Sequence, residues 1–317
     1  MKGRVSIIIP CWNAGRYLRD AITSCLEQSF DSPTGAAGSS IEIAVIDDGS
    51  ADDSLAIARG FEPAIHVFSG PNSGVSAARN RGISETGGEW IIFLDADDLL
   101  CRGTVKSRLD TADTSGADVI VCDWQELIER DGDVIDGAVK SVDVAALATD
   151  TALEAAMNIW APPAALMYRR SVVAKIGGFR NDLPIIQDAR FLFDASFHGA
   201  VFAHSPNVGA RYRVVPESLS RRDPARFWLD VLTNGKQIEA LWTAGGSLSR
   251  AQKRILAGLY GNAARGLFAS GHPGYFEAAE CERKHASRLP LHPRIAVPLA
   301  RTLGLGPARR VLGMLGR

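Results

Sequence analysis

The sequence predicts an α/β fold, with a mostly parallel central sheet flanked by helices and a helical C-terminal extension. Two features of the first hundred residues predict the sheet. Short β-branched runs alternate with segments whose apolar residues recur at helical spacing, and carboxylates follow directly after several of these runs. After Pro224 the strand pattern stops, and two long helical patterns at 227–241 and 251–268 predict the extension.

The first third of the chain predicts four strands joined by three helices. Each strand is a short run rich in Ile, Val and Phe, and each helix carries apolar residues on one face. Parallel strands joined by helices form a sheet that binds its ligands at the carboxyl ends of the strands. The expected strands are 5–9, 41–46, 65–68 and 90–94, and the expected helices are 15–28, 54–59 and 76–85.

The region that follows continues the same domain with a more mixed pattern. We expect strands at 117–122 and 164–168, with a helix at 144–159 between them. The sequence therefore indicates one domain over 1–222, with halves at 1–104 and 105–222, and a helical region over 223–317.

Composition excludes several classes of protein. The 35 Lys and Arg residues nearly balance the 36 Asp and Glu residues, and this net charge of −1 argues against nucleic acid as the main partner. The five cysteines are scattered and form no Cys-x-x-Cys pair, so neither a disulfide framework nor a zinc site is indicated. The apolar run 5–9 is too short for a signal sequence, and no apolar run is long enough to span a bilayer. We therefore expect a cytoplasmic protein.

The sharpest chemical feature is Asp95-Ala-Asp97-Asp98, which follows the apolar strand 90–94. Side chains alternate along a strand, so Asp95 and Asp97 can point the same way and share a hard cation. Mg²⁺ and Mn²⁺ bind one or two carboxylates together with substrate phosphates. The alternative is an acidic turn or helix cap.

Three other segments follow predicted strands or open a predicted helix. Asp48 can accept a hydrogen bond from a nucleotide base, or it can belong to a turn and helix cap. Trp12, in Pro10-Cys-Trp-Asn13, can lie near a base or be a plain loop aromatic. Arg79 can bind either a phosphate or a structural carboxylate.

Four segments in this order resemble glycosyltransferase family 2, the inverting transferases of GT-A fold that use nucleotide-diphospho-sugars. The segments are 5–13, 45–50, 72–80 and 90–98. The resemblance implies that Asp48 contacts the base, Asp95 the ribose or sugar side, and Asp97 an Mg²⁺ or Mn²⁺ ion that bridges the diphosphate. It also places Pro10, Trp12, Asn13 and Arg79 on the donor side.

The same resemblance implies a general base. The family carries a Glu-Asp motif, and its counterpart here is Gln187-Asp188, which makes Asp188 the candidate base. Its alternative is a cap on a helix at 189–197. The segment Trp160–Pro163 resembles the acceptor side, and Arg213 or Ser218 in the closing loop is expected to reach the diphosphate.

These residues imply transfer of a sugar from a UDP- or dTDP-type donor to a hydroxyl acceptor, in polysaccharide or cell-envelope glycan synthesis. A glycan or a lipid-linked carrier can serve as the acceptor. Two alternatives are an inactive nucleotide-sugar-binding scaffold, which Gln187 favours, and a sugar nucleotidyltransferase, whose Gly-rich phosphate loop is missing after the first strand.

The tail after Glu282 carries eight Lys and Arg residues and neither Asp nor Glu, with apolar residues between them. Such a basic amphipathic segment can lie on the inner face of an anionic membrane, or it can pack on the domain with a solvated basic face. The sequence leaves both alternatives open, because Pro293, Pro298 and Pro307 interrupt any long helix.

Overall fold

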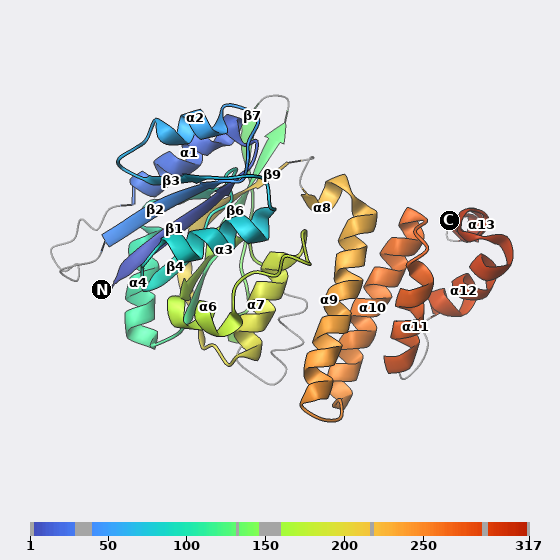
Figure 1. Cartoon of the computed structure of the whole chain (residues 1–317). Coiled ribbons are helices and arrows are strands. Elements are labelled where there is room, and N and C mark those ends of the chain that lie inside the picture. The colour runs from blue at the N-terminus through green and yellow to red at the C-terminus, as the bar shows by residue number, and fades with distance from the viewer. Residues whose placement is uncertain are drawn as a thin grey trace. The chain divides into compact units, whose positions relative to one another are not determined.

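The computed structural model describes residues 3–28, 40–130, 133–145, 160–215, 219–286 and 291–315. The chain divides into two compact units, Met1–Val215 and Pro216–Arg317. Every described strand belongs to the first unit, and the described part of the second unit is helical (Figure 1). This arrangement confirms the predicted α/β fold with a helical C-terminal region.

The central sheet begins with four parallel strands. Its strand order is β3-β2-β1-β4-β8-β6-β9-β5, with β7 paired to β6. The pairings β3–β2, β2–β1 and β1–β4 are all parallel, as predicted. The first four strands in chain order are β1 (Arg4–Cys11), β2 (Ser40–Asp47), β3 (His66–Ser69) and β4 (Trp90–Phe93). Their carboxyl ends therefore lie at one edge of the sheet.

The other half of the sheet is mixed. Strand β8 runs antiparallel to both β4 and β6, whereas β6 and β9 pair in parallel. Strand β9 was not predicted, because it contains Pro206 and Gly209 and its burial does not alternate regularly. The remaining strands are β5 (Leu99–Leu100), β6 (Val119–Arg130), β7 (Asp133–Lys140), β8 (Leu166–Arg169) and β9 (Phe202–Val214).

Helices cover the sheet closely. In the view of Figure 1, α1 (Gly15–Leu26) and α2 (Ser54–Arg59) lie above the first strands, and α3 (Val75–Glu85) lies below them. Gly82 of α3 sits directly on β1, since a Cβ there would lie 2.2 Å from Ile8 Cγ2. A larger residue at position 82 would therefore push α3 away from the sheet.

Four further elements of the first unit lie between residues 104 and 197. Helix α4 (Thr104–Ser115) buries Arg108, whose Nη2 donates to the carbonyl of Ala164 over 2.7 Å. Ala164 lies in the short 3₁₀ helix η2 (Pro163–Ala165), which precedes α6 (Arg170–Ile176) and α7 (Gln187–Phe197). The helix expected at 144–159 lies outside the described residues, apart from 144–145.

The second unit confirms the two predicted helices and adds others. Its helices are α8 (Leu219–Arg222), α9 (Pro224–Ala244), α10 (Arg250–Ser270), α11 (Tyr275–His285), α12 (Leu291–Leu303) and α13 (Leu305–Leu315). Helix α9 begins with Pro224 behind an Asp223 cap, and a capping box of Ser249 and Gln252 begins α10. Within the described ranges, none of the helices combines the length and apolarity that a bilayer crossing requires.

Candidate active site

The loops after β1 and β2 are tied together by Asn13. Its backbone N–H donates to Ser50 Oγ over 3.0 Å, and its Oδ1 accepts from the Ala51 N–H over 2.8 Å. Asn13 has a φ of 51°, in the left-handed region that asparagine tolerates better than most residues. Pro10 is buried in β1, while Trp12 is 47% exposed beside this junction. The carboxyl ends of the two strands therefore form one connected surface.

Asp48 braces the loop that leads into α3. Its two carboxylate oxygens accept from the backbone N–H groups of Ser73 and Gly74, each over 2.8 Å. Gly49 allows this loop to approach, because its φ is +74° and a Cβ would lie 2.8 Å from the Asn72 nitrogen. Each Asp48 oxygen keeps a second lone pair that a bound base could use.

Arg79 is a buried cation between two groups of carboxylates. Its side chain is 2% exposed, and its Nη2 donates to Asp95 Oδ1 over 2.5 Å. The guanidinium carbon lies 5.0 Å from the centre of the Phe179 ring, and its charge also acts on Asp188. Nε and Nη1 have no hydrogen-bond partner among the described residues. Of the two partners that the sequence allowed for Arg79, a phosphate or a structural carboxylate, the structure shows a carboxylate, that of Asp95.

The same helix clamps the chain that leads to α7. Asn80 Nδ2 donates to the Phe179 carbonyl over 2.9 Å, and Asn80 Oδ1 accepts from the Phe179 N–H over 2.7 Å. One turn earlier, Ser76 Oγ donates to the Arg180 carbonyl over 2.9 Å. Helix α3 therefore joins the donor half of the unit to the half that carries Asp188.

Asn80→Ala is expected to lower the free energy of unfolding by about 1–3 kcal/mol, because it leaves the amide and carbonyl of Phe179 unpaired. Urea denaturation would measure the change. Ser84→Ala is a matched control, since Ser84 lies on the same helix and its hydroxyl donates only to Arg81 of that helix. Equal stability of the two variants would contradict a clamping role for Asn80.

The acidic residues after β4 occupy different environments. Asp95 is partly exposed, whereas Asp98 is 1% exposed. Burial and the nearby negative charge of Asp95 raise the pKa of Asp97 to about 6. The pKa of Asp98 lies well above its ordinary value, because Asp98 is buried close to Asp97 and Asp95. The surrounding residues therefore neutralise only part of the negative charge of the Asp95–Asp98 loop.

Arg213 of β9 holds this acidic loop in place. Its backbone N–H donates to Asp98 Oδ1 and its Nε donates to the Asp97 carbonyl, over 2.8 and 2.9 Å. Its Nη1 donates to Glu129 over 2.8 Å, and the side chain is 5% exposed. The guanidinium is thus bound to protein groups, and contact with a diphosphate stays a prediction. Ser218 lies outside the described residues.

Asp188 is the second residue of α7, and the predicted cap role is wrong because Ile186 is the N-cap. Its Oδ2 accepts from Trp160 Nε1 over 3.0 Å, and its Oδ1 accepts from the Ala189 N–H over 2.8 Å. Burial raises its pKa, although the Arg79 charge and the Trp160 hydrogen bond oppose that rise. The Asp188 carboxylate is therefore more basic than that of an exposed aspartate, and one of its oxygens is held by the Trp160 indole.

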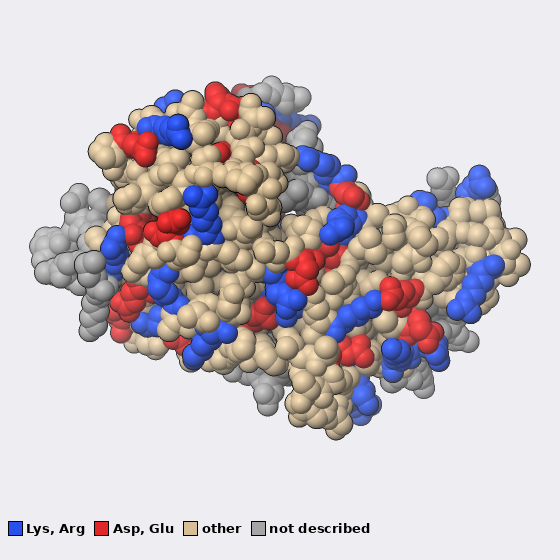
Figure 2. All heavy atoms as spheres, viewed as in Figure 1, with Lys and Arg blue, Asp and Glu red and all other residues tan. Residues whose placement is uncertain are grey.

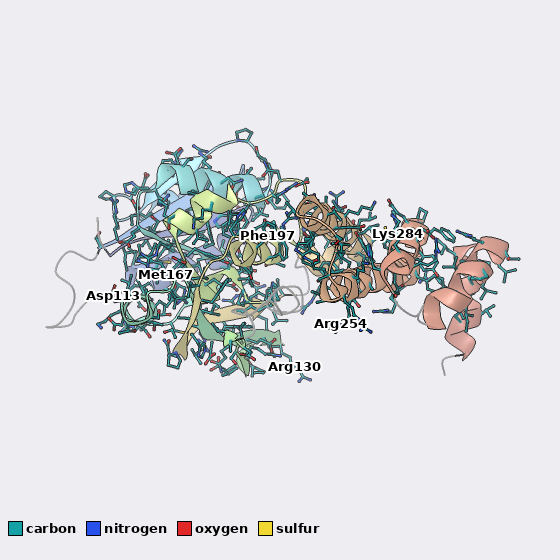
Figure 3. The ribbon with its side chains drawn as sticks, turned by 90° about the horizontal axis from the view of Figure 1, so that it is seen from below. Asp113, Arg130, Met167, Phe197, Arg254 and Lys284 are labelled. Carbon is teal, nitrogen blue, oxygen red and sulfur yellow. The ribbon has the colours of Figure 1, made fainter. Side chains whose placement is uncertain are left out.

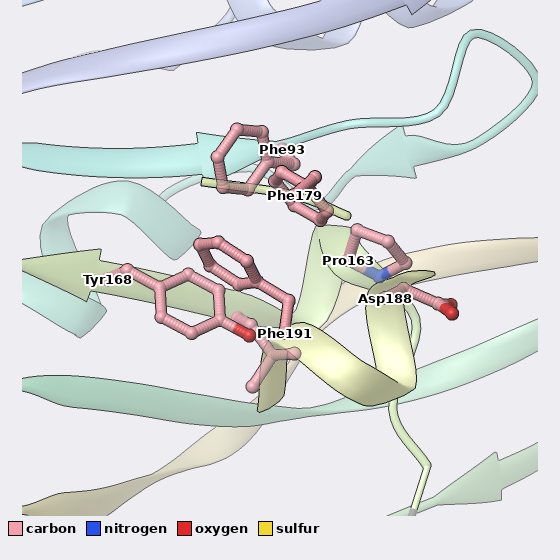
Figure 4. A pocket seen from close by; sticks show the side chains of 7 residues that line it. Phe93, Pro163, Tyr168, Phe179, Asp188 and Phe191 are labelled. Carbon is pink, nitrogen blue, oxygen red and sulfur yellow. The ribbon is translucent and has the colours of Figure 1, made fainter. Parts of the chain in front are cut away.

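Aromatic rings back the Asp188 helix, and the carboxylate points away from them (Figure 4). The cavity among these rings measures only about 10 Å³, which is room for at most one water. Its other lining residues are Phe93, Pro163, Leu166, Tyr168, Phe179 and Phe191. The rings that line the cavity give Asp188 its apolar surroundings, and the cavity itself is too small for a substrate.

Gln187 departs from the family motif in a way that the structure explains. Its side chain is buried, at 5% exposed, and its Oε1 has no hydrogen-bond partner among the described residues. A glutamate here would bury a charge where no described donor reaches that oxygen, at a considerable cost in free energy. The neutral glutamine is consistent with its surroundings and leaves Asp188 unchanged as a carboxylate.

Tyr212 of β9 is a site residue to which the sequence assigned no role. Burial and the negative charges of Asp98, Asp95, Asp97 and Asp188 all raise its pKa, so its hydroxyl stays protonated. Its ring centre lies 5.1 Å from that of Trp160. Trp160 donates to Asp188, and the backbone N–H of Arg213, next to Tyr212, donates to Asp98, so Tyr212 lies between Asp188 and the acidic loop.

The acidic loop fits a divalent cation that is shared with a phosphate ligand. In the parts of the chain that the structure describes, no group of three or more His, Cys, Asp or Glu residues is arranged to hold a metal. Mg²⁺ and Mn²⁺ need only one or two carboxylates when substrate phosphates complete the shell. The repulsion between Asp95 and Asp97 is what a cation there would relieve.

Basic and acidic side chains are interspersed over both units on the face shown in Figure 2. The expectation that nucleic acid is not the main partner stays a prediction.

Comparison with known proteins shows a similarity over the N-terminal segment. Residues 6–133 match the family model described as glycosyl transferase family 2. An uncharacterized glycosyltransferase of Haemophilus influenzae is 37% identical over 110 residues, which cover 33% of this chain and 41% of that protein. The first three curated relatives are matched over 34–42% of their own length.

Two solved structures share the fold at low identity. S. aureus TarS 1-349 in complex with UDP-GlcNAc has a TM-score of 0.69 at 18% identity, with 96% of this chain and 89% of that chain covered. The mannosyltransferase PcManGT from Pyrobaculum calidifontis, in complex with GDP-Man and Mn²⁺, has a TM-score of 0.54 at 19% identity, with 98% and 83% covered. Residues 6–133 are therefore similar to glycosyl transferase family 2, and the whole chain shares its α/β fold with these two solved structures.

Proposed function

We propose that the protein transfers a sugar from a nucleotide-diphospho-sugar to a hydroxyl acceptor, with inversion at the anomeric carbon. The main supporting observation is that β9 links Asp188 to the Asp95–Asp98 loop. Tyr212 packs against the Trp160 ring that donates to Asp188, and the next residue, Arg213, donates to Asp98. An inverting transfer needs a base on one side of the sugar and charge stabilisation of the leaving group on the other.

In this mechanism Asp188 takes the proton from the acceptor hydroxyl as that oxygen attacks the anomeric carbon. The burial that raises its pKa also makes it a stronger base than an exposed aspartate. Asp97, with Asp95 beside it, would hold the divalent cation, which when bound neutralises charge on the departing diphosphate. Asp48, Pro10, Trp12 and Asn13 form the proposed nucleoside side, and Arg79 fixes Asp95 there.

The two solved relatives support the class of donor. One binds UDP-GlcNAc, and the other binds GDP-Man with Mn²⁺. We propose a UDP- or dTDP-type donor, Mg²⁺ or Mn²⁺ as the cation, and a role in polysaccharide or cell-envelope glycan synthesis. The presence of Asp95, Asp97 and Asp188 disfavours an inactive scaffold.

Calorimetric titration of nucleotide-sugars tests this proposal. The panel holds UDP-, dTDP- and GDP-sugars and the free diphosphates, each with Mn²⁺, with Mg²⁺ and with EDTA. We expect one nucleotide to bind with a metal-dependent enthalpy, because the acidic loop alone repels a diphosphate. Inorganic pyrophosphate is the control for unspecific binding, and failure of every nucleotide to bind would contradict the proposal.

We also propose that the C-terminal tail contacts the inner face of a membrane. Three large apolar residues of α12 and α13 are exposed, namely Ile295 at 45%, Leu303 at 48% and Val311 at 38%. Over 295–303 and 305–312, where burial is described, the residues of these helices that are buried are small, namely Ala296, Ala300 and Ala308. The exposed residues Arg301 and Arg310 add positive charge. Apolar and basic side chains together suit the surface of an anionic bilayer.

The chain is expected to co-sediment with vesicles of phosphatidylglycerol in phosphatidylcholine, and less so at high salt. The double variant Arg301→Glu/Arg310→Glu should lose most of this binding. Lys253→Glu, an exposed change on α10, is the matched control. If the wild-type chain stays in the supernatant at low salt, the tail has only a structural role.

A further inference from the structure

Three aromatic side chains from separate segments meet beside Asp188. Trp160 precedes η2, Tyr212 lies on β9 and Trp124 lies on β6. The ring centres of Trp160 and Tyr212 are 5.1 Å apart, with the rings inclined by 74°. The ring centres of Trp160 and Trp124 are 6.1 Å apart, with the rings inclined by 89°. Edge-to-face contacts of this kind hold the Trp160 ring in a defined orientation.

Trp160 is fixed to the base and yet remains open to solvent. Its indole N–H donates to Asp188 Oδ2, so the ring lies within one hydrogen bond of the carboxylate that would take the acceptor proton. The residue is nevertheless 40% exposed. A tryptophan that is held by neighbours and still presents ring surface provides a flat apolar wall next to a polar group, which is the common make-up of a ligand site.

The charge at the edge of this wall is negative. Trp160 donates to Asp188, so a carboxylate lies within one hydrogen bond of the indole. Arg79 is paired with Asp95, and Arg213 is bound to Glu129 and to the backbone of Asp97. An anionic acceptor would be repelled by the Asp188 carboxylate, whereas a neutral hydroxyl group can donate to it.

We propose that the Trp160 wall is the acceptor subsite and that it takes a neutral sugar ring. One face of a pyranose is lined by C–H groups and stacks on an indole, while its hydroxyls point outward at the ring edge. Stacked on Trp160, the sugar presents an edge hydroxyl to Asp188 and another to Tyr212. This inference rests on the proposed transferase function, and it narrows the acceptor to an uncharged glycan end rather than a phosphate, an acidic sugar or a protein side chain.

Saturation-transfer NMR with methyl glycosides tests the subsite directly. The probes are the methyl glycosides of glucose, galactose and N-acetylglucosamine. Methyl glucuronide, which differs from methyl glucoside by a carboxylate, is the anionic probe. UDP or GDP with Mn²⁺ is present throughout, so that an ordered binding sequence does not hide the site. We expect a neutral glycoside to receive saturation mainly on the C–H groups of one ring face, and the glucuronide to bind at least about threefold more weakly.

Variants locate the binding at Trp160. Trp160→Leu should weaken the best neutral glycoside about tenfold, because the stacking surface is lost. Trp160→Phe should retain most of that affinity, since it keeps a ring and loses only the N–H. Phe197→Leu is the control, because Phe197 is also an exposed aromatic, at 37%, and lies at the opposite end of α7 from Asp188 (Figure 3).

A labelled tryptophan makes the test independent of destabilising variants. With 5-fluorotryptophan incorporated, the ¹⁹F resonance that Trp160→Phe removes should shift when the glycoside is added. Unaltered affinity in Trp160→Leu, equal binding of the glucuronide, or no glycoside binding by the wild type would each overturn the subsite. Calorimetry of the same variants distinguishes failure of the subsite from failure of the transferase proposal. Trp160→Leu should bind the nucleotide as the wild type does, even if it no longer binds the glycoside.

Discussion

Asp188→Asn is expected to lower the turnover of sugar transfer by about 10²–10⁴-fold while donor binding stays at its wild-type level. The amide has nearly the shape of the carboxylate, and its oxygen can still accept from the Trp160 indole or the Ala189 amide. It cannot take a proton from the acceptor. Turnover is measured as release of nucleoside diphosphate, and donor binding is measured by calorimetry.

Asp113→Asn provides the control for this comparison, because Asp113 is an exposed carboxylate on α4 (Figure 3). The wild-type pH profile gives a second test. Burial raises the pKa of Asp188, so activity should fall as the pH drops through that raised value, at a higher pH than for an ordinary aspartate. Near-normal turnover in Asp188→Asn would assign the role of base to another group.

Asp97→Ala is expected to abolish the metal-dependent part of donor binding, a loss of at least about 100-fold in affinity in the presence of Mn²⁺. The substitution removes the carboxylate that would share a cation with the diphosphate. The raised pKa of Asp97 means that its ionised form is disfavoured in the folded chain. Its removal should therefore leave the metal-free melting temperature at pH 8 unchanged or higher.

These two readouts distinguish a lost metal site from a misfolded protein. Titration with Mn²⁺ and with EDTA shows whether the donor enthalpy still responds to metal, and thermal unfolding without metal reports on the fold. Asp113→Ala should change neither. Donor binding by Asp97→Ala that still disappears in EDTA would place the cation elsewhere.

The parallel half of the fold, and the edge of the sheet at which Asp48 and Asp95 lie, could be predicted from the sequence, because local patterns determine them. The run 5–9 is apolar throughout, as a buried strand requires, and β1 forms over Arg4–Cys11. Asp48 and Asp95 follow strands directly, so the parallel topology places both at one edge of the sheet. The identity of Asp188 came from its motif rather than from periodicity.

The contacts around Asp188 could not be predicted in the same way, because they join residues that lie far apart in the sequence. Trp160 and Asp188 are 28 positions apart, and no spacing rule indicates that an indole donates to the carboxylate. Tyr212 lies on β9, whose Pro206 and Gly209 obscure the strand pattern. Arg213 illustrates the same limit, since its pairing with Glu129 joins residues 84 positions apart.

The rigid connection through α3 has a consequence for how such a site changes in evolution. Arg79 binds the acidic loop, and Asn80 on the same helix binds the chain leading to Asp188. Two consecutive residues of one helix therefore fix the spacing between Asp95 and the chain that leads to Asp188. If the proposed mechanism holds, substitutions around Trp12 can alter which donor is accepted without changing that spacing. New donor specificities can then arise by single residue changes, with the reaction geometry inherited intact.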